Sequence, residues 1–115
     1  MTTRTRTSTI GEVRERYQID EPQAVARYLR RHPGLAPLVV EARQRIAAVF
    51  GAETPVALSI IADPEIEHFS QLWALILVAP NTAGVSEKLE ALDRTWWLAA
   101  QRGFTDVFAV DTEFV

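Results

Sequence analysis

The segment Asp63-Pro64-Glu65-Ile66-Glu67-His68 gathers three carboxylates and one imidazole within a few residues. Such side chains bind divalent metal ions and act as general acids and bases. Their spacing matches no calcium-loop or zinc motif, however, and Asp-Pro is favourable turn chemistry. We therefore favour a solvated turn. Asp63, Glu65, Glu67 and His68 form the less favoured alternative of a metal-dependent or acid–base site.

Asp111 and Glu113 are two further carboxylates, separated by one residue on one face of a predicted strand. Paired carboxylates can exchange protons or hold magnesium. Acids of this kind also protect an exposed edge strand from unwanted pairing, and this is the interpretation that we favour. An acid–base enzyme would require these two residues to converge with the 63–68 segment in one pocket.

Other catalytic patterns are missing from the sequence. The chain has no cysteine, so it has no thiolate nucleophile and no cysteine-based zinc site. Its five glycines are scattered and form no phosphate-binding loop. We therefore predict no catalytic residues, no metal ligands and no cofactor. The sequence favours a protein that is not an enzyme without deciding the question.

Five arginines fall on the polar faces of two predicted helices: Arg27, Arg30, Arg31, Arg43 and Arg45. Arginine suits contacts with phosphate or carboxylate, so a weak nucleic-acid binder is one alternative. A sequence pI of about 5.3 and the lack of any recognition-helix pattern argue against it. Residues 1–50 carry a net charge of +4 and residues 51–115 a net charge of −7. We favour two halves that pair with and neutralise each other.

The composition is that of one globular domain. With 115 residues, of which 48% are hydrophobic, the chain can build one core but not two. Residues 1–8 are predicted to be a flexible tail before a single domain at 9–115. The chain shows no apolar run typical of a secretory signal, and no apolar stretch approaches the length of a membrane helix. We therefore expect a cytoplasmic protein without membrane contact.

The first half of the chain predicts three helices. Thr9 and Glu12 form a capping-box pattern for a first, short helix. Asp20 caps the second helix, which Pro33 ends. The third helix has one continuous apolar face and ends at Gly51, in a left-handed cap. That face comprises Leu35, Leu38, Val39, Ala42, Ile46, Val49 and Phe50.

The second half predicts the order strand, strand, helix, strand. Strands are expected at 55–62, 72–79 and 107–114, and the helix runs from Val85 to Gly103. The first two strands form a hairpin. The last is expected to lie parallel to the second, with a place beside the first as one option. The fold class is therefore α+β: N-terminal helices, then β-β-α-β, with a three-stranded mixed sheet packed against helices.

The second face of this sheet is too apolar to remain in water. Its candidate residues are Ala57, Ser59, Ile61, Trp73, Leu75 and Leu77. Either the N-terminal helices cover this face, which we slightly favour, or another copy of the chain does. The second alternative is the main argument for a homodimer or a partner interface.

Tryptophan is enriched at binding hot spots, which draws attention to Trp73 and to the dipeptide Trp96-Trp97. Trp96 lies on the buried stripe of its helix, whereas Trp97 points about 100° away, toward Arg94. We favour core packing for Trp97, with an exposed interface anchor as the alternative. The candidate interface residues are Trp73, Trp97 and Arg94.

Three segments stand in a recognisable order: Tyr28-Leu29-x-x-His32-Pro33, Asp63-Pro64-Glu65 and Leu92-Asp93-x-x-Trp96-Trp97. Together they resemble a family of small uncharacterised bacterial proteins, common in cyanobacteria, over residues 17–115. Family members often carry a Glu or Asp before the tandem tryptophans, where this chain has Arg94-Thr95. The resemblance implies no activity and transfers no functional residue, because no activity is established for the family.

The sequence thus favours a small non-enzymatic protein-interaction or regulatory protein, antitoxin-like, with a homodimer as one form. The alternatives are a metal-dependent or acid–base enzyme that uses the acidic loop at 63–68, and a weak nucleic-acid binder. Self-association or a protein partner is expected, and nucleic acid is not.

Overall fold

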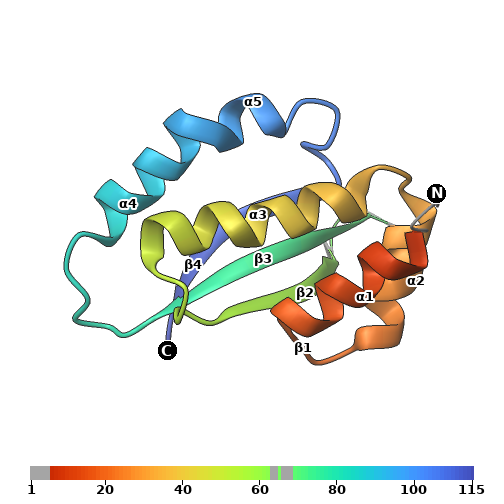
Figure 1. Ribbon diagram of the computed structural model, residues 1–115, viewed down its shortest axis with the longest axis horizontal. Helices are drawn as coiled ribbons and strands as arrows, with labels where there is room; N and C mark the ends of the chain where they lie inside the picture. The colour runs from red at the N-terminus through yellow and green to blue at the C-terminus, as the bar shows by residue number, and fades with distance from the viewer. Residues whose placement is uncertain (1–5, 63–64, 66–68) are drawn as a thin grey trace.

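A computed structural model describes residues 6–62, 65 and 69–115. Its elements, in chain order, are α1 (Arg6–Arg16), β1 (Gln18–Ile19), α2 (Pro22–Arg31), α3 (Leu35–Phe50), β2 (Val56–Ala62), β3 (Ser70–Val78), α4 (Val85–Leu92), the π-helix η1 (Asp93–Trp97), α5 (Leu98–Ala100) and β4 (Phe108–Phe114). The last three helical elements follow one another without a break and cross from β3 to β4 (Figure 1). The predicted α+β class is confirmed. No helix in the described part of the chain has the length and apolar character needed to span a membrane.

The strands form one mixed sheet in the order β1-β2-β3-β4. β2 and β3 are antiparallel, whereas β1 runs parallel to β2 and β4 runs parallel to β3. The prediction of three strands was wrong because β1 has only two residues, too few for an alternating pattern to show. The prediction that the last strand runs parallel to the second is confirmed by β4 and β3. β4 does not lie beside β2, because β1 pairs with the other edge of β2.

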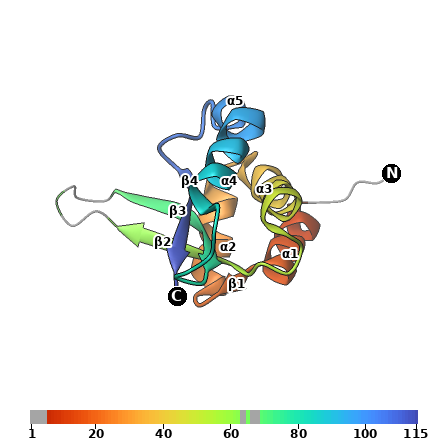
Figure 2. The same cartoon turned by 90° about the vertical axis from the view of Figure 1, so that its left-hand side faces the viewer.

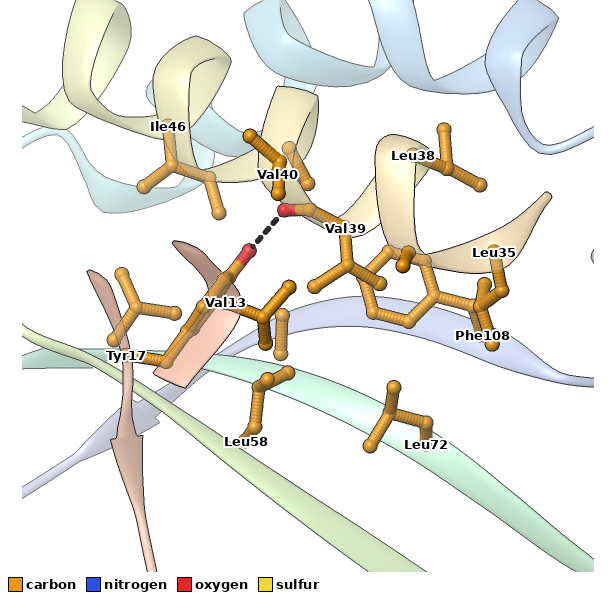
Figure 3. Close-up of a cluster of buried hydrophobic side chains, with 14 of the residues drawn as sticks. Val13, Tyr17, Leu35, Leu38, Val39, Val40, Ile46, Leu58, Leu72 and Phe108 are labelled. Atoms are coloured by element: carbon orange, nitrogen blue, oxygen red, sulfur yellow. Dashed lines mark hydrogen bonds between the residues drawn. The ribbon is translucent and has the colours of Figure 1, made fainter. Parts of the chain in front are cut away.

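All the described helices lie on the same side of the sheet (Figure 2). On that face Leu58, Leu72 and Ile76 are at most 1% exposed. α1 packs on α3 rather than on the sheet's other face: the Tyr17 hydroxyl donates a hydrogen bond to the Val39 carbonyl oxygen at 2.8 Å (Figure 3). The expectation that the N-terminal helices cover the second face was therefore wrong. The reason is that α3 buries a wide stripe, which accommodates the sheet on one flank and α1 on the other.

Arg43 joins three segments that are distant in the sequence. Its Nε donates to the carbonyl oxygen of Arg16 at 3.1 Å, where α1 ends. Its Nη2 donates to the carbonyl oxygens of Thr54 at 3.0 Å and Ala52 at 3.4 Å, between α3 and β2. A positive charge at the carbonyl end of a helix is favourable. Arg43 is therefore a structural side chain, not part of a solvated arginine face.

The helix boundaries differ in detail from those predicted. α1 begins at Arg6, so residues 6–8 of the predicted tail are helical, and residues 1–5 lie outside the described part. α2 begins at Pro22 as expected, but Glu21 rather than Asp20 occupies the cap position, and no side chain caps the helix. Gly51 ends α3 as predicted, but with a φ of 107° and a ψ of 143° it does not form the predicted left-handed cap; the positive φ still favours glycine.

Candidate interaction surface

The face of the sheet that points away from the helices is the candidate site, and we call it the open face. In Figure 2 the described helices all lie to the right of the β2–β3 hairpin. Alternation along the strands assigns to it Ala57, Ser59, Ile61, Gln71, Trp73, Leu75, Leu77, Ala109, Asp111 and Glu113. Ile61 is 45% exposed. The other apolar side chains are half-buried, because neighbours on the strands shield one another.

The open face has a relief that the register determines. β3 contributes the large side chains Trp73, Leu75 and Leu77. Trp73 is flanked by Ser59 on β2 and Ala109 on β4, and the β2 neighbour of Leu75 is also small, Ala57. Directly opposed side chains in a sheet stand about 5 Å apart. β3 therefore forms an apolar ridge, with a shallow trough of small side chains over β2.

Acidic side chains border the open face along β4. Asp111 is the cross-strand neighbour of Leu75 and Glu113 that of Leu77, and both acids are exposed. Asp111 also influences Asp93, at the start of η1: burial raises the pKa of Asp93, and the nearby charges of Asp111 and Glu90 raise it further. β4 is the last strand of the sheet, so the two acids lie on an edge strand as expected, and their protection of that edge stays a prediction.

The predicted acid–base residues that the structure describes are Glu65, Asp111 and Glu113, and they lie at different places along the sheet. Of the loop residues only Glu65 is described, in the turn between β2 and β3; Asp63, Glu67 and His68 lie outside the described residues. Asp111 is level with Leu75, five residues along β3 from Ser70 at the hairpin end, which is roughly 17 Å. Within residues 6–62, 65 and 69–115, no three metal-ligating side chains are grouped to hold an ion.

The other two candidate interface residues do not lie on the open face. Trp97 is 6% exposed and its ring meets the Phe108 ring edge-on at 5.5 Å, in the core. Core packing of Trp97 is therefore confirmed, and the alternative of an exposed anchor was wrong. The sequence could not show that Asp93–Trp97 is a π-helix, whose wider turn lets both tryptophans face inward. Arg94 is exposed on the same turn, on the helical side of the sheet.

The arginine residues are dispersed. Arg27, Arg30 and Arg31 are exposed on α2, and Arg45 pairs with Glu41 at 3.3 Å. The second ion pair between described residues joins Arg16 and Glu12 at 3.8 Å. Both pairs lie in the N-terminal half, so the predicted pairing between the two halves is not found among the described residues. The acids bordering the open face remain available to a partner.

Two residues of the open face were not singled out from the sequence. Ala109 shares the alternation of Asp111 and Glu113, which was the available signal, but its role depends on β4 lying beside β3. Gln71 precedes the predicted start of its strand. Its Nε2 donates to the Thr105 carbonyl oxygen at 3.0 Å and ties the loop before β4 to the hairpin end of the face.

Comparisons of the chain with known protein families, with curated proteins and with solved structures find no match. The resemblance to a bacterial family therefore stays a prediction. The argument for function rests on the geometry of the open face.

Proposed function

We propose that this protein is a small non-enzymatic interaction module that binds another protein chain through the open face of its sheet. The observation that carries the proposal is the collection of Ile61, Trp73, Leu75 and Leu77 on a face that the described helices leave in water. Covering the apolar area that these side chains still expose contributes about 25 cal/mol per Å², and over several side chains this provides a driving force for association.

The chemistry of the face favours protein over nucleic acid as the partner. A tryptophan within an apolar centre, bordered by charged residues, is the arrangement of a protein–protein hot spot. Asp111 and Glu113 on the same face repel phosphate, whereas nucleic-acid binding depends on basic side chains. We propose a regulatory, antitoxin-like role in the bacterial cytoplasm, in which the module acts by occupying a partner's surface.

Affinity capture from the native host tests this function. The test variant is Leu75→Lys, which places a charge in the centre of the open face. The matched control is Leu98→Lys, because Leu98 is 57% exposed on α5, on the helical side. Circular dichroism verifies that both variants fold.

We expect the wild type and Leu98→Lys to retain the same protein, either a second copy or another chain, and Leu75→Lys to lose it. If all three forms retain the same proteins, or none retains any, the open face is not a binding surface.

A further inference from the structure

We propose that the partner of the open face is a second copy of this chain. The two copies pack face to face about a two-fold axis parallel to the strands, with β3 of each copy over β2 of the other. This inference rests on the proposed function, because it uses the same face.

The relief of the face is self-complementary in this arrangement. A two-fold axis between β2 and β3 places β2 of one copy over β3 of the other. Each β3 side chain then faces its own β2 cross-strand neighbour, contributed by the other copy. By the register, Leu75 of one copy then faces Ala57 of the other, and Trp73 faces Ser59. The ridge of each copy thus lies in the trough of its partner, as close packing of two sheets requires.

The margins are complementary as well. Gln18, Ala57, Leu75 and Asp111 share one level across the four strands. The same axis therefore places Asp111 of one copy opposite the exposed Gln18 of the other, whose amide can donate to a carboxylate.

The competing two-fold arrangement is unfavourable for two reasons. An axis across the strands would place β3 on β3 and β4 on β4. Ridge would then meet ridge, and the copies of Asp111 and Glu113 would approach one another. Like charges brought together at an interface cost binding energy. Antiparallel pairing of two β4 edges meets the same repulsion.

The size of the face suits a small dimer. The four strands have two, seven, nine and seven residues. With a rise of roughly 3.3 Å per residue and strands about 4.8 Å apart, they give a flat area of roughly 400 Å² per copy. Side-chain relief increases the accessible area. The pair then approaches the total of about 1,000 Å² that a specific interface needs.

Chemical cross-linking of single-cysteine variants tests the arrangement, because the chain has no cysteine of its own. The variants are Gln18→Cys and Asp111→Cys, one carrying a size tag, treated with a short bismaleimide after their folding is verified. In the proposed dimer, residue 18 of one copy lies about 10 Å from residue 111 of the other, the spacing of packed sheets. Identical positions in the two copies are roughly 17 Å apart, because three strand spacings, about 14 Å, separate them sideways in addition to the spacing of about 10 Å between the sheets.

We expect the mixture to cross-link several-fold more than either variant alone. Efficient cross-linking of Asp111→Cys with itself would overturn the arrangement, because β4 would then lie on β4. A dimer by light scattering that gives no mixed cross-link would also overturn it.

A trough-filling variant tests the fit of ridge to trough without removing apolar surface. Ala57→Trp should raise the dissociation constant of the dimer at least tenfold, whereas Ala99→Trp, on exposed α5, should not. An unchanged dimer with Ala57→Trp would contradict the ridge-in-trough packing.

A monomeric wild type that captures a different protein through Leu75 would overturn the second copy as partner. That outcome would leave the proposed function standing, so the two failures are distinguishable.

Discussion

Replacing Tyr17 by phenylalanine separates the contribution of a buried hydrogen bond from that of a buried ionisable group. The Tyr17 side chain is 7% exposed, and its hydroxyl donates to the Val39 carbonyl oxygen at 2.8 Å. Val39 lies inside α3, so its carbonyl keeps a helical partner when the hydroxyl is removed. The loss is therefore that of one net hydrogen bond. We expect Tyr17→Phe to lower the free energy of unfolding by about 1 kcal/mol at pH 7.

The effect of the substitution should reverse in alkali. Burial raises the pKa of Tyr17 well above its ordinary value of 10.0, and the charge of Arg43 lowers it only in part. The unfolded chain therefore releases a proton above pH 10 that the folded chain keeps. This stabilisation is complete below pH 10 and is lost as the pH rises further, by about 1.4 kcal/mol at pH 11. Phenylalanine has no such proton, so the two stability curves should cross at about pH 10.6.

Denaturant unfolding, followed by tryptophan fluorescence between pH 7 and pH 11, measures both curves. The pKa of Tyr28 is also raised by burial, but Tyr28 is present in both proteins and cancels in the difference. A difference that stays constant over the whole range would refute the reasoning, because it would mean that Tyr17 ionises equally in the folded and unfolded chains.

Three further stability predictions follow from the contacts. Arg43→Ala should lower the free energy of unfolding by about 2 kcal/mol, measured by denaturant unfolding. Arg43→Lys should not restore this stability, because an ammonium cannot reach the carbonyl oxygens of Arg16 and Thr54 together. Full stability with lysine would contradict the role of these hydrogen bonds. Asp93→Asn should raise the melting temperature slightly at pH 7 and have no effect near pH 3. Burial and neighbouring carboxylates raise the pKa of Asp93, so its negative charge destabilises the fold at pH 7. A variant that melts at a lower temperature at pH 7 would contradict this direction. Gly51→Ala should lower the free energy of unfolding by about 1–2 kcal/mol, measured by thermal melts, because a φ of 107° strains any residue with a Cβ. An unchanged melting temperature would contradict this backbone conformation at residue 51.

Strong periodicity made much of the fold predictable. The apolar stripe of α3, the alternation of β2 and β3, and the helix beginning at Val85 each involve many residues that repeat at one spacing. β1 could not be predicted, because two residues form no pattern and their pairing with β2 depends on where α1 ends. The choice of face by the N-terminal helices was also out of reach, since an apolar stripe does not state what it will pack against.

The candidate site was predictable in composition but not in shape. The sequence indicated that Trp73, Leu75 and Leu77 share an apolar face. Their arrangement as a ridge became evident only from the register of β3 against its two neighbours. Trp97 was ambiguous because a regular α-helix would turn it away from Trp96, and the π-turn that buries both is a tertiary effect.

The solution mass by light scattering, over a range of protein concentrations, tests most directly the claim that a second copy covers the open face. The account predicts that the wild type and Leu98→Lys reach twice the chain mass of 12.9 kDa, and that folded Leu75→Lys stays at 12.9 kDa. A wild type that stays at 12.9 kDa at every concentration would contradict it.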